Sequence, residues 1–440
     1  MKLLIRDTTL VTVNAGDDVL HAADLAIDGD SIAGVGFAPD GFVPDRVIDG
    51  RERIVLPGLI NTHTHLSMTL MRNYADDLGF WPWLLERVKP LEDHLYPEDV
   101  RIGARLGLAE MIRGGTTCFH DMYFLLDEVA DEVAEAGVRA RLCGALFDNS
   151  GQGEALLEAA VGLHDRWHGK AEGRVTVGLG PHSPYLCSPG YLREILGEAE
   201  RLECGLHIHV AETDREVAES RERHGLSPVQ HLAELGCFRV PTVAAHGIYV
   251  DAADRRLLRE GKVSVAHNPG SNLKLANGIA PVQELLEDGV NVSLGTDGAA
   301  SNNNLNLFEE MHLAALLQKW LRRDPEALPA RQVLRMATID GAKALGMEAE
   351  LGSLEVGKQA DVVLVDAAQP HLAPRHDPVA LLVYSAQAAD VCMVLVKGRI
   401  LLENRELTTI DAASLLARAT EQTRQLLERA AVGKRPRVGP

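Results

Sequence analysis

The pattern of apolar and polar positions changes twice along the chain and divides it into three parts. Up to about residue 56, apolar and polar residues alternate with a period of two between turns rich in Gly and Asp, which is typical of β-hairpins. Short apolar runs with Gly and Asp turns return from about residue 360. Between these parts, apolar runs alternate with stretches of helical spacing. The pattern predicts two β-rich ends, free to pair into one sheet, and a strand–helix repeat in the middle.

Eight apolar runs in the middle part have the length of buried strands. They are Ile54–Ile60, Thr116–His120, Ala140–Leu146, Val175–Gly180, Leu206–Val210, Thr242–His246, Val263–His267 and Val290–Thr296. Most are followed by helical spacing, as in Glu128–Gly137 and Glu194–Cys204. Eight buried strands alternating with helices predict an α/β fold, a closed (β/α)8 barrel of the TIM type. In that fold the chemistry lies at the carboxyl ends of the strands.

Composition and charge narrow the classes of function. The 440 residues include 44 Lys and Arg against 63 Asp and Glu, a net charge of −19. This excess of acid argues against nucleic-acid polymers, whose phosphates need a basic surface, and against anionic membranes. Hydrophobic residues make up 46% and charged residues 24%, which is ordinary for a globular protein and excludes general disorder.

The sequence carries no signal for export or membrane insertion. Its six cysteines are scattered without a CxxC pair, which favours reduced thiols over disulfides. Met1–Asp7 lacks the apolar segment of a signal peptide. No apolar run approaches the length of about 20 residues that spans a bilayer. We therefore expect a cytoplasmic protein.

Two pairs of histidines lie at predicted strand ends. His63 and His65 come just after the first run, and His207 and His209 lie in the fifth. Residues i and i+2 share one face of a strand, about 6–7 Å apart, so each pair is able to converge on one metal ion. His209 is nearer the carboxyl end and is the better ligand candidate, whereas His207 is expected to pack lower in the barrel. For an isolated pair, two loop histidines without a metal are the alternative.

Three further polar residues follow the same rule. His246 ends its apolar run, Asp297 follows a strand in Gly-Thr-Asp-Gly, and Glu212 comes three residues after His209. A buried aspartate needs a partner, and a metal ion is a suitable one. Taken singly, Glu212 is typical of a surface acid and Asp297 of an Asp-Gly turn. Together with the histidine pairs, they predict a site of imidazoles and a carboxylate that suits Zn²⁺ or another first-row divalent ion.

Six stretches of the sequence resemble the amidohydrolase superfamily. They are Pro57–His65, Gly180–Tyr185, His207–Thr213, Ala245–Gly247, His267–Leu275 and Gly295–Asn303. The resemblance runs nearly from end to end and is closest to the branch of amino-group hydrolases that includes 5′-methylthioadenosine/S-adenosylhomocysteine deaminases. It implies a catalytic barrel of residues 57–359. It also implies a composite β-sandwich built from residues 1–56 and 360–440.

The resemblance further implies one divalent metal ion. Its ligands would be His63, His65, His209 and Asp297. Relatives with two metals usually carry a lysine at the end of the fourth strand, where this chain has Gly180-Pro181-His182. One ion, Zn²⁺ before Fe²⁺ or Mn²⁺, is therefore expected.

The implied reaction is hydrolytic deamination of a 6-aminopurine nucleoside: 5′-methylthioadenosine, S-adenosylhomocysteine, adenosine or 5′-deoxyadenosine. Water activated at the metal would attack the ring carbon that bears the amine. Asp297 would accept the proton of that water, His246 would orient it, and Glu212 would protonate the neighbouring ring nitrogen. Substrate contacts are expected from Trp83, Glu92, His182 and Glu212. Glu92 would bind the ribose hydroxyls, and Trp83 would wall the pocket or anchor the core.

One departure and two alternatives qualify this reading. Relatives that bind the homocysteine part of the substrate carry arginines in and after the third strand, whereas Leu142–Leu156 has none. A guanidinium group able to bind both oxygens of a carboxylate is therefore missing there. S-adenosylhomocysteine is therefore a less secure substrate than the other three. The alternatives are an aminohydrolase or dechlorinase of another heterocycle (guanine, cytosine, pterin or s-triazine) and a non-catalytic scaffold. Partners are expected to be a small-molecule nucleoside and further copies of the chain, as a dimer or tetramer, with no nucleic acid and no membrane.

Overall fold

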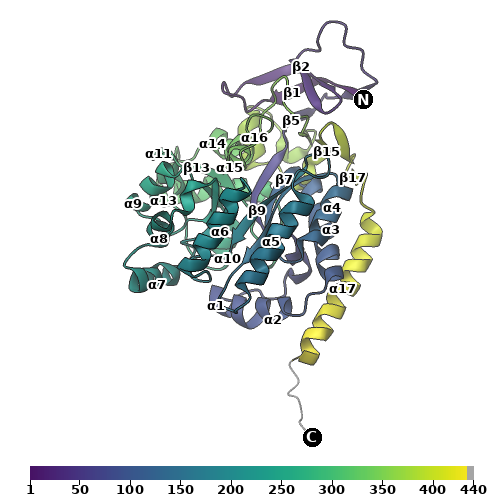
Figure 1. The fold of residues 1–440 in the computed structure, drawn as a ribbon. Helices are drawn as coiled ribbons and strands as arrows, with labels where there is room; N and C mark the ends of the chain where they lie inside the picture. Colours follow the sequence, from purple (N-terminus) through teal and green to yellow (C-terminus); the bar gives the residue numbers. More distant parts are fainter. Residues whose placement is uncertain (434–440) are drawn as a thin grey trace.

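Two β-sheets organise the computed structural model, which describes residues 1–433 (Figure 1). The first sheet holds eight parallel strands in sequence order. They are β6 (Leu59–Thr64), β7 (Thr116–Tyr123), β8 (Arg139–Leu146), β9 (Val175–Pro181), β10 (Leu206–Val210), β11 (Thr242–His246), β12 (Ser264–His267) and β13 (Asn291–Leu294). These strands lie within or across the eight predicted runs.

The first and last strands, β6 and β13, close the barrel through a mixture of backbone and side-chain hydrogen bonds. The backbone N–H of Asp297 donates to the carbonyl of His63 at 2.9 Å. The hydroxyl of Thr62 donates to the carbonyl of Leu294 at 2.8 Å. The predicted (β/α)8 barrel is confirmed, and its seam brings the end of β13 directly beside the end of β6.

Helices follow the strands around the outside of the barrel (Figure 1). They are η1 (Leu66–Met71), α1 (Phe80–Pro82), η2 (Trp83–Val88), α2 (Lys89–Glu92), α3 (Pro97–Arg113), α4 (Leu126–Ala136), α5 (Gly153–Trp167), α6 (Pro189–Arg201), α7 (Asp214–His224), α8 (Pro228–Leu235), η3 (Cys237–Arg239), α9 (Ala252–Glu260), α10 (Pro269–Lys274), α11 (Val282–Glu287), α12 (Ala299–Asn302), α13 (Leu307–Arg322), α14 (Ala330–Met336) and α15 (Ile339–Ala344). The boundaries of α7 follow ordinary capping rules. Thr213 caps its N-terminus, where its hydroxyl accepts from the N–H of Glu216 at 3.1 Å, and Gly225 ends it at a φ of 73°.

The second sheet is built from both ends of the chain and has nine strands. They are β1 (Lys2–Val11), β2 (Val19–Asp28), β3 (Ser31–Gly36), β4 (Arg46–Asp49), β5 (Arg53–Pro57), β14 (Val362–Asp366), β15 (Val391–Val396), β16 (Arg399–Glu403) and β17 (Glu406–Leu407). The two ends meet where β14 pairs antiparallel with β5, with Val362 opposite Pro57. The sheet encloses its own apolar cluster, which includes Leu25, Ile27 and Leu395.

The chain passes from this sheet into the barrel at Gly58, within a run that the sequence presents as one strand. Residues 54–57 belong to β5 of the terminal sheet, and residues 59–60 begin β6 of the barrel. A Cβ at Gly58 would collide with the side chain of Thr117, so the crossing needs a glycine. The prediction of a single barrel strand over Ile54–Ile60 is wrong, because apolar periodicity does not indicate which sheet a residue joins.

The remaining C-terminal elements leave the sheet and pack on the barrel. They are η4 (Pro370–Leu372), α16 (Pro378–Tyr384), η5 (Ala388–Asp390) and α17 (Ala412–Gly433). The long helix α17 lies along α3 (Figure 1), where Gln422 donates to the carboxylate of Asp99 at 2.8 Å. The division into units of 57–359 and 1–56 with 360–440 stays a prediction, and residues 434–440 lie outside the described part. Among residues 1–433, no helix is long and apolar enough to span a bilayer.

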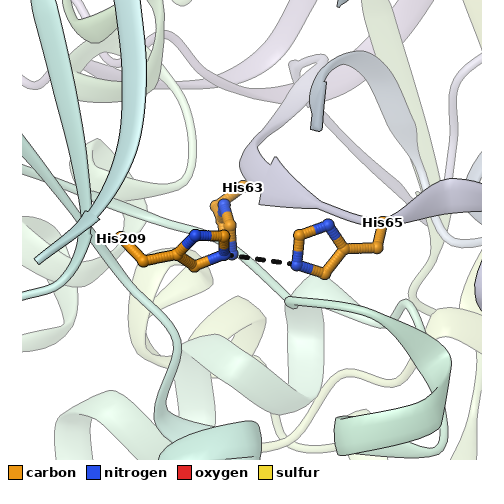
Figure 2. Close-up of side chains that lie close together, drawn as sticks. All are labelled: His63, His65 and His209. Atoms are coloured by element: carbon orange, nitrogen blue, oxygen red, sulfur yellow. Dashed lines mark hydrogen bonds between the residues drawn. The ribbon is translucent and has the colours of Figure 1, made fainter. Parts of the chain in front are cut away.

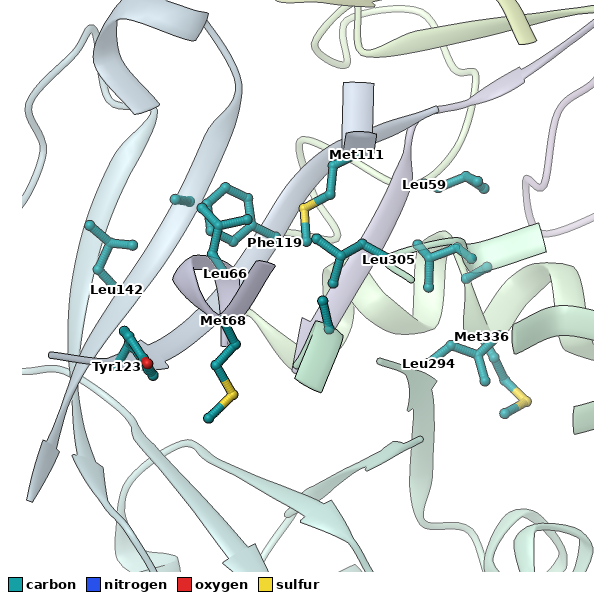
Figure 3. Packing of buried hydrophobic residues seen from close by; sticks show 14 of the residues in the cluster. Leu59, Leu66, Met68, Met111, Phe119, Tyr123, Leu142, Leu294, Leu305 and Met336 are labelled. Carbon is teal, nitrogen blue, oxygen red and sulfur yellow. The ribbon is translucent and has the colours of Figure 1, made fainter. Parts of the chain in front are cut away.

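The barrel core is largely aliphatic and continuous with the surrounding helices. Figure 3 shows Phe119 and Leu142 on neighbouring strands, with Leu66 and Met68 of η1 and Met111 of α3 nearby. All five side chains are buried. Each buried side chain of this size contributes roughly 1.5–3 kcal/mol by leaving water. This packing holds the strand ends rigidly, which a site built from several strands requires.

Candidate active site

Three imidazoles converge at the carboxyl end of the barrel (Figure 2). The ring centroids of His65 and His209 each lie 4.9 Å from that of His63. Nδ1 of His65 is 2.6 Å from the carbonyl oxygen of Met122, and Nδ1 of His209 is 2.6 Å from that of His182. A carbonyl oxygen only accepts, so each Nδ1 carries a hydrogen and donates it. In the neutral rings, Nε2 of both His65 and His209 is therefore left with a lone pair.

These lone pairs face one another and require a positive charge between them. Nε2 of His65 is 3.4 Å from Nε2 of His209, and the buried Nε2 of His63 has no hydrogen-bond partner among the described residues. Oδ1 of Asp297 lies 3.2 Å from Nε2 of His65 and 3.4 Å from Nε2 of His63. Three imidazole nitrogens and one carboxylate oxygen form a donor set that fits Zn²⁺ or a similar divalent ion. The residues present therefore fit a metal ion.

Asp297 reaches this centre from the turn after β13. It adopts the left-handed conformation, with a φ of 59°, which is strained for a residue other than glycine. Its Oδ2 accepts a hydrogen bond from the hydroxyl of Ser271 at 2.6 Å. Burial alone would raise the pKa of this carboxyl, but the neighbouring imidazoles of His63 and His65 hold it well below its usual range. The group is therefore an ionised carboxylate in the middle of the site.

His246, at the end of β11, is fixed in a similar way. It has a φ of 75°, and its Nδ1 lies 2.8 Å from Oδ1 of Asn272. Because Nδ1 donates to that amide oxygen, Nε2 presents its lone pair to the cavity, 3.8 Å from Oε2 of Glu212. Burial lowers the pKa of His246, so the ring is neutral near neutral pH. A neutral ring here is able to hold and orient a water molecule.

Glu212 lies just past β10 and is 4% exposed. Its Oε1 accepts a hydrogen bond from Nδ2 of Asn277 at 3.0 Å. Burial, reinforced by the negative charge of Asp297, raises the pKa of Glu212 well above its usual range. Glu216 holds the same turn, since its carboxylate accepts the N–H groups of Ala211 and Glu212 at 2.9 and 2.8 Å. Glu212 is therefore a rigidly placed carboxyl that carries a proton near neutral pH.

A cavity opens at these groups and is lined by every predicted site residue except His63, which lies beneath it. Trp83 forms part of the wall and is anchored, because its indole N–H donates to the carbonyl of Ala300 at 3.2 Å. Burial raises the pKa of Glu92 and lowers the pKa of His182 to about 3. The wall thus offers an apolar face, a carboxyl group and a neutral imidazole around one space.

A buried layer lies below the site and contains the histidines without a predicted role. Nε2 of His207 is 2.8 Å from Nδ1 of His63, so it accepts the hydrogen that directs Nε2 of His63 to the centre. The ring of His120 stacks on His207 at 3.7 Å and 18°, with its Nε2 3.3 Å from Sγ of Cys143. Two stacked rings share no in-plane point where both could bind one ion, which argues against a second metal site here. His267 is buried, and its role remains unassigned.

Several partners of the site were not predicted from the sequence. Ser271 and Asn272 hold Asp297 and His246, and both come from the stretch directly after β12. A usable signal was present, because a run of Asn and Ser after a buried strand faces the same end of the barrel as the ligands. The carbonyl of Met122 left no such signal, because every residue carries a carbonyl group.

Comparison with known proteins places these features in context. The amidohydrolase family matches residues 54–401. The chain is 47% identical over 431 residues, 98% of this chain and 100% of the other, to a Thermoanaerobacter pseudethanolicus protein named 5-methylthioadenosine/S-adenosylhomocysteine deaminase. The structure of the present chain is similar to that of an adenosine deaminase from Xanthomonas campestris with bound zinc (TM-score 0.93, 36% identity, 97% of this chain and 98% of the other). It is also similar to an atrazine chlorohydrolase from Arthrobacter aurescens complexed with zinc (TM-score 0.89, 28% identity, 96% and 100%).

Both similar structures contain zinc, and the grouped histidines and aspartate of this chain suit such an ion. A metal cofactor is therefore supported by relatives and by geometry. The family match covers most of the chain, and the identity to the curated relatives extends over nearly all of it. The curated relatives are named as deaminases, which are hydrolases that act on carbon–nitrogen bonds, and the chain belongs to the amidohydrolase family.

Proposed function

We propose that this protein is a metal-dependent hydrolase that removes the 6-amino group of a 6-aminopurine nucleoside and releases ammonia. The observation that carries the proposal is the juxtaposition of two buried carboxyl groups, Glu212 and Asp297, across one cavity. Burial raises the pKa of Glu212, whereas the neighbouring His63 and His65 lower that of Asp297. Such a pair supplies a proton donor and a proton acceptor at the same time. The names of the relatives, with 47% identity over nearly the full chain, support the nucleoside as substrate.

One divalent ion, Zn²⁺, is proposed as the cofactor. It would be held by His63, His65, His209 and Asp297. When bound, such an ion supplies Lewis acidity and lowers the pKa of a water molecule toward neutrality. The hydrogen bonds from His63 to His207 and from His209 to the carbonyl of His182 fix the rings so that Nε2 is available.

The residues of the chain then divide the proton transfers among them. Asp297 accepts a proton from the attacking water, and Nε2 of His246 orients that water. The water oxygen forms a bond to C6 of the purine while Glu212 delivers its proton to the adjacent ring nitrogen. Asp297 then passes the proton that it accepted to the amino group, the C6–N bond breaks, and ammonia leaves. The hydroxyl at C6 loses its proton to Glu212, which forms the carbonyl of the product and restores the acid. Each transfer uses a protonation state that burial and neighbouring charges already favour.

The remaining wall residues are proposed to position the nucleoside. Trp83 packs against the base, Glu92 accepts hydrogen bonds from the ribose hydroxyls, and His182 contacts the substrate beside His209. Further copies of the chain, in a dimer or tetramer, are proposed as its protein partners.

Ammonia release measured across a nucleoside panel tests this function. The panel contains adenosine, 5′-deoxyadenosine, 5′-methylthioadenosine and S-adenosylhomocysteine, with guanine, cytosine, a pterin and an s-triazine beside them. We expect ammonia from the 6-aminopurine nucleosides only. Activity confined to a triazine would favour the second candidate, a hydrolase of another heterocycle, which the 28% identity to the atrazine chlorohydrolase supports. Intact ligand positions argue against a non-catalytic scaffold.

A further inference from the structure

A second cavity, of about 260 Å³, adjoins the one that contains the proposed catalytic groups. The two share four lining residues: Leu84, Glu92, Phe124 and His182. If Glu92 binds the ribose, as the proposed function has it, this outer cavity lies where the 5′ substituent of the nucleoside extends. What lines it therefore decides which 5′ groups the enzyme accepts.

The outer cavity combines an apolar collar with a charged rim. Leu85, Phe147 and Leu186 contribute the apolar part, which suits the methylene and thioether groups of an extended 5′ substituent. The rim on the side of α7 carries Arg215 and Arg223. Both arginine side chains are more than half exposed, at 56% and 58%, so they are accessible to a ligand and screened by water.

Arg215 is held in place by two contacts that leave part of its guanidinium free. Its Cζ lies 4.4 Å from the ring centroid of Trp81, and its Nε donates to Oε1 of Glu219 at 2.7 Å. Oε2 of the same carboxylate accepts from Arg223 at 3.1 Å. Within the described residues, no hydrogen bond uses the two Nη groups of Arg215. A stacked guanidinium with both Nη groups free is ready to bind a carboxylate with little loss of side-chain entropy.

We propose that Arg215 binds the carboxylate of an α-amino acid at the end of the 5′ substituent, as in S-adenosylhomocysteine. This inference rests on the proposed nucleoside deaminase function. This assignment accounts for the absence of arginines in Leu142–Leu156, a stretch that contributes Phe147 and Asn149 but no cation to the outer cavity. The cation comes instead from α7, on the rim, with Arg223 adding a second positive charge. Lys89 also lines the cavity, but its ammonium group donates to Asp93 at 3.1 Å. Arg215 thereby determines specificity for the long substrate over the short one.

The test compares two nucleosides and two variants. Steady-state kcat/KM is measured for S-adenosylhomocysteine and 5′-methylthioadenosine with wild type, Arg215→Gln and the control Arg221→Gln. Arg221 lies on the same helix, 3.6 Å from Asp251, and does not line the cavity. We expect Arg215→Gln to lower the ratio of kcat/KM for S-adenosylhomocysteine to kcat/KM for 5′-methylthioadenosine about threefold to fivefold, the upper part of the range for a solvent-screened charge pair. Arg221→Gln should leave the ratio unchanged.

A binding measurement separates failure of this inference from failure of the proposed function. Calorimetry with S-inosylhomocysteine, the deaminated product, should give a Kd about threefold to fivefold higher for Arg215→Gln than for wild type. A ratio and a Kd within twofold of wild type would overturn the role of Arg215 while leaving the deaminase intact. Absence of ammonia from all four 6-aminopurine nucleosides would instead overturn the proposed function, and the calorimetric result would still decide whether Arg215 binds the amino-acid end.

Discussion

Replacing Glu212 by Gln tests the proposed proton donor with little disturbance of the structure. Glutamine has nearly the same shape, and its side-chain oxygen is able to keep the 3.0 Å hydrogen bond from Asn277. What it lacks is a transferable proton. Burial raises the pKa of Glu212, so the wild-type carboxyl carries that proton near neutral pH. Positioned acid–base groups contribute about 10²- to 10⁴-fold to rate, or about 3–5 kcal/mol of activation free energy.

We therefore expect Glu212→Gln to reduce kcat by about 10²- to 10⁴-fold in an ammonia-release assay, while the metal content and melting temperature stay near wild type. Glu222→Gln removes a charge from the exposed part of α7 and serves as the control. A kcat for Glu212→Gln within about tenfold of wild type would refute the assignment, because the range for a positioned acid begins above that. Loss of metal together with activity would also refute it, since it would make Glu212 part of the metal site.

Three further predictions concern metal affinity and stability. His207→Phe removes the acceptor for Nδ1 of His63, and the metal Kd, measured by competition with a chelator, should rise about 10- to 100-fold; an unchanged Kd would make His207 a packing residue only. Asp361→Ala leaves the buried Arg139 without its carboxylate partner at 2.8 Å, so the free energy of unfolding, measured in urea, should fall by about 3–5 kcal/mol. The double variant Arg139→Met/Asp361→Leu should recover most of this loss. A double variant no more stable than Asp361→Ala would show that the two side chains are not coupled. Burial raises the pKa of Glu310 from 4.5 to about 8, so between these pH values the folded protein holds a proton on Glu310 that the unfolded protein does not. The stability that the protonated Glu310 contributes is therefore lost as the pH rises through about 8. The melting temperature of Glu310→Gln relative to wild type should therefore increase from about pH 6 to about pH 9, and a constant difference would contradict this sign.

The barrel and its metal-site candidates were predictable because both depend on features local in the sequence. Strand and helix alternate with distinct periods, and the fold gathers the carboxyl ends of parallel strands at one face. His65, His209 and Asp297 each stand at such an end, so their convergence follows from the fold. The neighbouring position of Glu212 follows from the short turn after β10.

The remaining features depend on loop geometry and packing between distant segments, which leave no periodic signal. The crossing at Gly58 interrupts a uniformly apolar run, and the pairing of β5 with β1 and β14 reveals it. His246 and Asp297 adopt left-handed conformations, and their side chains are hydrogen-bonded to Asn272 and Ser271, each 26 positions away along the chain. In the sequence, Arg215 has the features of an ordinary surface residue. Its stacking on Trp81, more than a hundred positions earlier, is visible only in the folded structure.

The most direct test of the central claim is a metal titration of ammonia release. Protein stripped with a chelator receives increasing Zn²⁺ while deamination of 5′-methylthioadenosine is followed. Ligands from His63, His65, His209 and Asp297 form one site, so ammonia release should be absent at first and rise to a plateau at about one Zn²⁺ per chain. Full activity in metal-free protein, or zinc bound at that stoichiometry without ammonia release from any 6-aminopurine nucleoside, would contradict the account.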